Sequence, residues 1–374
     1  MDLLVIFFAS CLLIYAFFIG RNAWWFARIQ PATPLPDPLL PFLSILIPAR
    51  NESDHISRTI YAAVHQTYPA DRMEVILLND HSTDATGYIA RIMEDRYPRL
   101  RVVDLPKGKE GKKAALSMGV DMARGEVILQ TDADCVVGEN WARTMTSYLV
   151  GKTAMVAGPV QLTHNQELIQ RLQALETIGL VGITAGSMAA GKPNMSNGAN
   201  LGYWKDAFIK VGGYQGIDQL ASGDDELLMQ KITKEGGYEV GFVKSREAIV
   251  KTSALPSWKE IKNQRLRWVS KARYYIDKRA NIIQLISYFA FLGFPILTLF
   301  GITDPIYALI AFELFVIKLI ADYYLMNRSA RFFHKFPLLK DLLILQFIYI
   351  PYVLWVGIAG NFVKNYKWKD RWVT

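Results

Sequence analysis

Four long apolar runs constrain the fold of this chain more than any other feature of its sequence. Of the 374 residues, 51% are hydrophobic, and they are concentrated at the two ends of the chain. The runs lie at 3–20, 282–302, 305–326 and 342–363. Each is close to the ~20 residues that an α-helix needs to cross the hydrocarbon core of a bilayer. We therefore expect a membrane protein with a large polar part between its apolar ends.

The first run is expected to remain in the mature protein as an anchor. A signal peptide begins with a basic segment, whereas Met1 and Asp2 supply no positive charge. Arg21 and Arg28 follow the run, and basic residues concentrate on the cytoplasmic side of membrane proteins. The sequence thus predicts a multi-pass protein of the inner cell membrane, with its N-terminus outside and its polar part in the cytoplasm.

The basic C-terminal tail conflicts with three further crossings, which would place it outside the cell. Its cations are Lys364, Lys367, Lys369 and Arg371. One of the three C-terminal runs is therefore expected to be re-entrant or interfacial. Run 305–326 is a candidate because it contains Glu313, Lys318 and Asp322, and charges are costly at membrane depth unless they are paired or functional. An ion pair between Lys318 and Asp322, four residues apart, is the simpler interpretation of two of these charges.

The charge and the cysteines exclude two classes of protein. The net charge is +8, but the basic residues are scattered or flank the apolar runs, which indicates anionic lipid headgroups rather than nucleic acid as the partner. Cys11 and Cys135 are the two cysteines. They lack zinc-ligand spacing and are too few for a disulfide framework, which suits a reducing cytoplasm.

The polar part alternates apolar strands with helices. Strands are predicted at 42–48, 73–79, 100–105 and 127–130, and helices at 56–67, at 85–97 and up to about residue 123. This alternation is typical of right-handed βαβ units, and hence of an α/β domain with a mostly parallel sheet. Ligands of such domains bind beyond the carboxyl ends of the strands.

Polar residues follow three of the predicted strands. Asp132 and Asp134 come directly after the fourth strand, and their i, i+2 spacing places both carboxylates on one side of an extended backbone. Such hard oxygen ligands suit Mg²⁺ or Mn²⁺ held together with substrate phosphates. Arg50 and Glu52 follow the first strand and Asp80 the second. Each of these residues also has a plainer interpretation; Asp80, for example, could simply stabilise a turn. Because all of them follow strands at the same edge of the predicted sheet, we favour a site for a nucleotide diphosphate.

The ordered set of segments at these strand ends resembles the family-2 inverting glycosyltransferases. The segments are 44–52, 79–84, 111–116 and 131–134, and the resemblance extends to about Trp268. It implies a GT-A-like domain that binds a UDP-sugar and uses Mg²⁺ or Mn²⁺. The residues implied around the nucleotide-sugar are Ala49, Arg50, Glu52, Asp80, Lys112 and Asp132. Asp132 and Asp134 are the implied metal ligands, and Ser117 stands where many members have asparagine.

A second acidic cluster, Asp224 and Asp225, lies far along the chain from the first. Inversion requires a carboxylate that takes the proton from the acceptor hydroxyl. The resemblance places this base at Asp225, with Asp224 replacing the more usual glutamate near the acceptor and diphosphate. Acidic residues at a helix N-terminus also suit the helix dipole, and this alternative is compatible with catalysis.

A basic, aromatic-rich stretch at 258–281 contains the Q-x-x-R-W motif of membrane-bound family-2 enzymes, which include ceramide-type glycolipid synthases and processive polysaccharide synthases. Gln264 and Arg267 share one face of a helix, and Trp268 lies beside them. The predicted partners are the diphosphate for Arg267, the acceptor for Trp268, and the acceptor or the diphosphate for Gln264. The composition alone favours an amphipathic interfacial helix, and both descriptions can hold together.

The predicted organisation has six parts. They are an anchor at 1–22, a proline-rich linker at 23–42, a cytoplasmic glycosyltransferase domain at 43–257, the interface helix at 258–281, transmembrane or re-entrant helices at 282–363 and a basic tail at 364–374. The predicted activity is transfer of a hexose or N-acetylhexosamine from a UDP-sugar to a membrane lipid. The alternative is a processive polysaccharide synthase. The lipid is favoured because the chain has few helices from which to build a channel for a polysaccharide. A non-catalytic scaffold is disfavoured because no metal or base position is missing.

Overall fold

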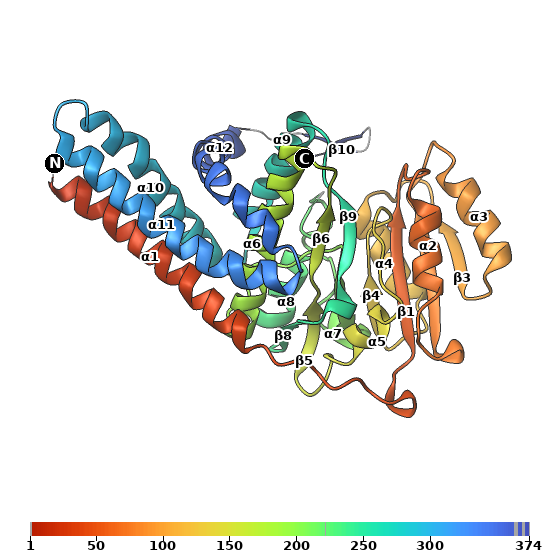
Figure 1. Ribbon diagram of the computed structural model, residues 1–374. Coiled ribbons are helices and arrows are strands. Elements are labelled where there is room, and N and C mark those ends of the chain that lie inside the picture. Colours follow the sequence, from red (N-terminus) through yellow and green to blue (C-terminus); the bar gives the residue numbers. More distant parts are fainter. Residues whose placement is uncertain (1, 221, 363–365, 369–370, 374) are drawn as a thin grey trace. The chain divides into compact units, whose positions relative to one another are not determined.

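The computed structural model describes residues 2–220, 222–362, 366–368 and 371–373 (Figure 1). Lys364 and Lys369 of the predicted basic tail lie outside these residues. The chain forms two compact units. The helical unit consists of Met1–Arg28, His164–Ala190 and Leu255–Tyr366, and the α/β unit of Ile29–Thr163, Gly191–Ala254 and Lys367–Thr374.

A seven-stranded sheet forms the centre of the α/β unit, in the order β3-β2-β1-β4-β7-β5-β8. The strands are β1 (Leu43–Ala49), β2 (Met73–Asn79), β3 (Leu100–Asp104), β4 (Val127–Gln130), β5 (Thr153–Ala157), β7 (Leu201–Trp204) and β8 (Glu239–Phe242). The first four are parallel, with Ile45 of β1 opposite Val75 of β2 and Leu129 of β4. Strand β7 is antiparallel to both β4 and β5. The predicted α/β class with a mostly parallel sheet is confirmed.

Helices and short strands complete this unit. The helices are α2 (Ile56–Val64), α3 (Thr86–Arg96), α4 (Lys112–Met122), α5 (Trp141–Thr146), α7 (Lys205–Lys210) and α8 (Glu226–Lys234), with single 3₁₀ turns at Asp37–Leu39, Ala70–Arg72 and Arg246–Ala248. Strand β6 (Val160–Thr163) pairs in parallel with β9 (Val250–Ser253), and β10 (Tyr366–Trp368) pairs with β11 (Arg371–Val373). Helix α2 ends at Val64, three residues before the predicted end at residue 67. Its last turn is closed by the backbone N–H of His65, which donates to the carbonyl of Tyr61.

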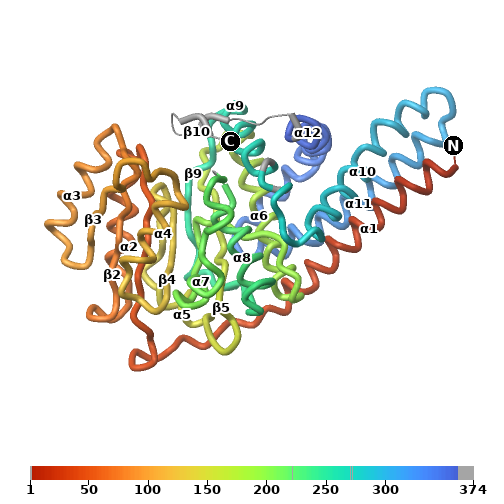
Figure 2. The backbone as a smooth tube through the Cα atoms, turned by 180° about the vertical axis from the view of Figure 1, so that it is seen from behind, coloured from red at the N-terminus to blue at the C-terminus, as the bar shows by residue number. Residues whose placement is uncertain are grey.

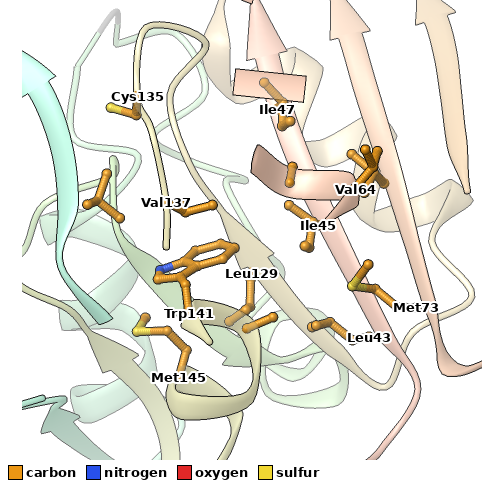
Figure 3. Close-up of a cluster of buried hydrophobic side chains, with 14 of the residues drawn as sticks. Leu43, Ile45, Ile47, Val64, Met73, Leu129, Cys135, Val137, Trp141 and Met145 are labelled. Carbon is orange, nitrogen blue, oxygen red and sulfur yellow. The ribbon is translucent and has the colours of Figure 1, made fainter. Parts of the chain in front are cut away.

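The core of the α/β unit is formed by side chains of the central strands and of α5 (Figure 3). Strand β2 is buried at every position, as expected for a parallel strand covered on both faces. Trp141 is fully buried in this core, and its indole N–H donates to Asn200 Oδ1 at 2.9 Å. The Asn200 amide in turn donates to the carbonyls of Pro159 and Ala248. The Trp141–Asn200 pair thus ties four separate segments together.

Six long helices form the helical unit. They are α1 (Asp2–Arg28), α6 (Leu168–Ala189), α9 (Trp258–Ser270), α10 (Arg279–Phe300), α11 (Pro305–Phe332) and α12 (Leu342–Phe362), with 3₁₀ turns at Lys271–Tyr274 and Phe336–Asp341. Helices α1, α10 and α11 lie side by side in Figure 1 and Figure 2 and pack against one another. The predicted anchor therefore continues as helix beyond residue 22 to Arg28, because Phe26 is buried within the bundle. The predicted interface helix at 258–281 ends earlier, at Ser270.

Among the described residues, three helical segments are long and apolar enough to cross a membrane. They are Asp2–Arg28, Arg279–Phe300 and Phe336–Gly360. Helix α11, which contains the predicted run 305–326, is not one of them. The predicted ion pair within α11 is confirmed, because Lys318 Nζ donates to Asp322 Oδ2 at 2.7 Å and both side chains are buried.

Helix α6 lies in a stretch for which the sequence predicted no element. The stretch was expected within the domain 43–257, but α6 packs against α1 and α11 and belongs to the helical unit. A Cβ atom on Gly186 would lie 2.2 Å from the carbonyl oxygen of Asn22, and one on Gly182 would lie 2.3 Å from Ser329 Oγ. These glycines therefore permit the close approach of α6 to both neighbours, as small residues do in membrane helix packing.

The Trp141–Asn200 pair provides a test of the α/β core. Replacement Trp141→Ala removes a fully buried side chain and leaves Asn200 Oδ1 without its donor. We expect the free energy of unfolding to fall by about 3–5 kcal/mol, measured by thermal unfolding in detergent. The control is Tyr88→Ala, since Tyr88 is 72% exposed. Equal melting temperatures for the two variants would contradict this account of the core.

Candidate active site

Three chain segments meet beyond the carboxyl ends of β1, β2 and β4. The backbone N–H of Asp80 donates to the carbonyl of Ala49 at 2.8 Å, and that of Thr131 donates to Leu46 at 3.2 Å. Asn51 and His81 each occupy the left-handed region, with φ of 49° and 51°. Both residue types tolerate this conformation better than most, and the tight turns that result keep the segments at the sheet edge.

Arg50 and Asp80 are buried at this edge. Arg50 Nη1 donates to the carbonyls of Asp80 and His81 at 2.7 and 3.1 Å. Asp80 Oδ2 accepts a hydrogen bond from the backbone N–H of Gly111 at 3.0 Å. Glu52 lies in the same turn, and its backbone N–H donates to Thr86 Oγ1. The structure therefore brings Ala49, Arg50, Glu52 and Asp80 together, and their contacts with a nucleotide stay a prediction.

Lys112 joins the two acidic clusters. Its Nζ lies 2.6 Å from Asp132 Oδ1 and 2.9 Å from Asp224 Oδ2. Burial alone lowers the pKa of the Lys112 ammonium, but the two carboxylates outweigh burial and raise the pKa above its usual value. Burial and the neighbouring carboxylates raise the pKa of Asp132, although Lys112 opposes this shift. Residues that are far apart in the sequence thus share one ion-paired site.

Asp132 and Asp134 can provide oxygen ligands for a divalent cation. One ligand atom of each, together with the sulfur of Cys135, lies within 4.8 Å of the others. The Cys135 thiol donates to Asp134 Oδ1 at 3.3 Å, and burial raises its pKa, so the sulfur stays protonated. Thr252 Oγ1 donates to Asp134 Oδ2 at 3.2 Å and fixes this carboxylate from β9. Two carboxylates beside an inert thiol fit the oxygen preference of Mg²⁺ or Mn²⁺.

Asp225 begins helix α8. Its Oδ1 accepts from the backbone N–H of Glu226 at 2.6 Å, and its Oδ2 accepts from Gly198 at 3.1 Å. Asp225 therefore caps the N-terminus of α8, as the alternative interpretation of this acidic cluster predicted. Asp224 is buried and paired with Lys112, whereas Asp225 is partly exposed. Of the two carboxylates, Asp225 is the more accessible to a substrate.

Gln130 and Gly198 also belong to this site, although the sequence did not single them out. Gln130 Nε2 donates to the carbonyl of Gly198 at 3.1 Å and lies 3.5 Å from Asp224 Oδ2. A Cβ atom on Gly198 would lie 2.6 Å from Asp224 Oδ2 and 2.8 Å from Lys112 Nζ. A side chain at this position would therefore displace the ion pair between Lys112 and Asp224. Gln130 could have been identified from the sequence, because it is a polar residue at the end of an otherwise apolar strand.

Lys113 was also missed from the sequence, because it stands in a basic segment, 107–113, in which a buried lysine looks like a solvated one. Its buried Nζ donates to the carbonyls of Ile217, Leu220 and Ser222, each at 2.7 Å. Lys231 Nζ similarly donates to Gly213 and Gln215. Two ammonium groups thus hold residues 213–220 and Ser222, which precede Asp224 and Asp225 in the chain.

The Q-x-x-R-W residues belong to the helical unit. Within it, Arg265 Nη1 donates to Gln264 Oε1 at 3.0 Å, and the Arg265 guanidinium lies 4.1 Å from the centre of the Trp268 ring. Gln264, Arg267 and Trp268 lie on α9. Their contacts with acceptor and diphosphate stay a prediction.

Two family models match the chain. Glycosyl transferase family 2 matches residues 44–209, and glycosyl transferase family group 2 matches residues 127–325, more than half of the 374 residues. Both ranges contain Asp132 and Asp134, and the second also contains Asp225 and the Q-x-x-R-W residues.

Similar proteins have related descriptions. The chain is 29% identical to the probable glycosyltransferase YdaM of Bacillus subtilis over 306 residues, which cover 76% of this chain and 68% of that protein. It is 30% identical over 137 residues to the beta-monoglucosyldiacylglycerol synthase of Synechocystis sp., or 34% of this chain and 29% of that protein. The solved mannosyltransferase PcManGT of Pyrobaculum calidifontis, in complex with GDP-Man and Mn²⁺, has a TM-score of 0.58 at 18% identity and covers 96% of this chain and 97% of its own. This likeness shows a GT-A-like fold.

Lys113 offers a test of how the second acidic cluster is positioned. Lys113→Met keeps most of the side-chain length but removes the donor for three carbonyls. We expect a loss of about 1–3 kcal/mol in local stability, seen as faster amide hydrogen exchange across 213–222 by mass spectrometry. The matched control is Lys109→Met, because Lys109 is exposed. Unchanged exchange across 213–222 in Lys113→Met would show that this lysine does not hold the segment.

Proposed function

Because the chain belongs to the family 2 group of glycosyltransferases, we propose that it is a membrane-anchored inverting enzyme. The proposed donor is a UDP-sugar carrying a hexose or N-acetylhexosamine, and the proposed acceptor is a membrane lipid. The observation that carries the proposal is the ion-paired site in which Lys112 contacts both Asp132 and Asp224. This contact links Asp132 to Asp224, the neighbour of Asp225 in the chain, and so supports a metal site and a base within the α/β unit, as a single displacement requires.

The donor is held by the segments beyond β1, β2 and β4. Asp80 and Arg50 fix the turns that would enclose the uridine. A divalent cation bound by Asp132 and Asp134 would neutralise the charge that develops on the leaving UDP. Lys112 keeps a positive charge beside Asp132 and Asp224 and limits the repulsion between these two carboxylates. Thr252 holds Asp134 in one orientation, as residues that support metal ligands commonly do.

Asp225 acts as the general base of the proposed reaction. Its carboxylate takes the proton of the acceptor hydroxyl while that oxygen forms a bond to the anomeric carbon. The bond from the anomeric carbon to the diphosphate oxygen breaks in the same step, and UDP leaves with the electron pair. Attack from the face opposite the leaving group inverts the configuration. Asp224 is less suited to this role because Lys112 already occupies its carboxylate.

A lipid acceptor is supported by two observations. Three helical segments among the described residues are apolar and long enough to cross a membrane. The beta-monoglucosyldiacylglycerol synthase that resembles part of this chain is, by its name, an enzyme of glycolipid synthesis. Together they favour a membrane-resident hydroxyl compound over a soluble acceptor.

The nature of the product distinguishes a lipid acceptor from a growing polysaccharide. Purified enzyme in membranes would be incubated with candidate radiolabelled UDP-sugars and Mn²⁺. We expect label from one donor in a discrete band that organic solvent extracts. Label in long, insoluble chains would instead establish a processive synthase, and the absence of transfer from every UDP-sugar would refute the proposed donor class.

The variant Asp225→Asn tests whether Asp225 is the general base. Asparagine keeps one oxygen to cap α8 at the N–H of Glu226 but loses the acceptor for the N–H of Gly198, so the melting temperature is measured alongside turnover to verify that the variant folds. We expect the turnover number to fall by about a hundredfold to ten-thousandfold, with unchanged UDP binding in isothermal titration calorimetry.

The matched control for this variant is Asp206→Asn, because Asp206 is an exposed aspartate in the first turn of α7. The control should retain full turnover. If Asp225→Asn also kept full turnover, Asp225 would not be the base.

A further inference from the structure

Within the helical unit, α6 holds the Q-x-x-R-W helix α9 at two places. Gln173 Nε2 donates to the carbonyl of Leu255 at 2.8 Å, and the backbone N–H of Leu255 donates to Gln173 Oε1 at 3.1 Å. Leu255 lies shortly before Trp258, the first residue of α9. Glu176 Oε2 accepts from Arg265 Nη2, in the middle of α9, at 2.5 Å. Gln173 and Glu176 are three residues apart and therefore share one face of α6.

The ion pair between Glu176 and Arg265 is buried. The side chains are 13% and 4% exposed. Replacing a buried ion pair by apolar side chains of similar size is often neutral or stabilising. Stability alone is therefore a weak reason for this pair, and the orientation that it gives to α9 is a stronger one.

Arg265 orients the amide of Gln264. Arg265 Nη1 donates to Gln264 Oε1 at 3.0 Å. A guanidinium has only donors, so the oxygen of the amide must be the atom that faces Arg265, and the nitrogen is turned away from it. Gln264 is half-buried. A ligand that reaches Gln264 therefore meets N–H donors, and without Arg265 the amide would be free to rotate.

Arg265 also orients the ring of Trp268. The guanidinium lies over the indole, 4.1 Å from the centre of the ring, and such stacking is attractive. It covers one face of the ring and limits the conformations of this half-buried side chain. One buried guanidinium thus fixes both Gln264 and Trp268, for which substrate contacts are predicted.

We propose that Glu176 is a positioning residue of the transfer reaction. It fixes the guanidinium of Arg265 and, through it, the Gln264 amide and the Trp268 ring against which the acceptor binds. The inference rests on the proposed function and adds to it a residue of α6 that is 89 positions from Arg265 in the chain. Glu176 itself contacts no substrate, so its loss should weaken acceptor binding and spare the donor site of the α/β unit.

The orientation of Trp268 can be measured without any transfer activity. The full chain would be labelled with 5-fluorotryptophan in detergent micelles, and the ¹⁹F NMR resonance of Trp268 would be assigned by its loss in Trp268→Phe. We expect Glu176→Leu to shift or broaden this resonance, because the guanidinium over the ring loses its partner. An unchanged resonance in folded Glu176→Leu protein would overturn the proposal.

The matched control for this variant is Asp341→Leu. Asp341 is also a buried carboxylate paired with an arginine, since Arg171 Nε of α6 lies 2.8 Å from Asp341 Oδ2. This pair joins α6 to the 3₁₀ turn Phe336–Asp341 and not to α9, so the Trp268 resonance should stay unchanged. An equal change in Asp341→Leu would show a general loosening of the helical unit and would contradict a specific role of Glu176.

A double variant separates positioning from stability. Glu176→Leu/Arg265→Met replaces the ion pair by apolar side chains, so the melting temperature should be near that of wild type or higher. We expect the KM for the acceptor to rise about tenfold, with the donor KM near its wild-type value. Glu176→Leu alone should raise the acceptor KM by the same factor, because the two residues act as a unit.

A merely structural ion pair predicts different kinetics. Its loss would lower the folded fraction, which reduces turnover and leaves both KM values unchanged. A wild-type acceptor KM in the folded double variant would overturn the proposal, including the case in which Glu176→Leu alone does not fold. The control Arg171→Met/Asp341→Leu should keep the wild-type acceptor KM.

The kinetics use dioleoylglycerol in mixed micelles as the first acceptor, since diacylglycerol is part of the name of the similar synthase. If dioleoylglycerol is not glycosylated, the lipid that takes up label in the transfer experiment replaces it. The absence of transfer from every UDP-sugar would contradict the proposed function, and the Trp268 resonance would still decide whether Glu176 positions the motif. A shifted resonance together with an unchanged acceptor KM would retain the function and contradict the role of Glu176 in acceptor binding.

Discussion

The ion pairs of Lys112 are the interaction on which the site depends. Asp132, Asp134 and Asp224 place three carboxylates close together, and such a group is unfavourable without a compensating cation. Lys112, at the start of α4, supplies this cation through contacts of 2.6 and 2.9 Å. Gly198 leaves the space that the ion pair needs. The acidic site can therefore be preformed before a metal or a diphosphate arrives.

A similar arrangement recurs in the helical unit, where Lys318 and Arg265 compensate Asp322 and Glu176. In each unit cations are thus paired with carboxylates. The α/β site has two carboxylates suited to a divalent cation and its diphosphate, whereas Asp322 and Glu176 join helices of the helical unit to one another.

The parallel half of the sheet was predictable because its strands are short apolar runs that polar residues end or directly follow, as with Arg50 after β1 and Asn79 at the end of β2. The antiparallel strand β7 was not predictable, because an apolar run in the sequence does not reveal in which direction the strand runs through the sheet. Helix α6 was missed because its glycines and polar residues interrupt the apolar pattern, although Gly182 and Gly186 serve close helix packing. Lys113 was missed because a lysine that binds carbonyls looks the same in sequence as a solvated one.

The central claim is that the acidic residues directly after β4 and those directly before α8 form a single active site. A crystal structure grown with UDP and Mn²⁺, with the ion located by its anomalous scattering, tests this most directly. The account predicts a manganese peak between Asp132 and Asp134, the diphosphate of UDP beside it, and Asp225 facing the same space. Manganese or UDP bound away from these carboxylates would contradict it.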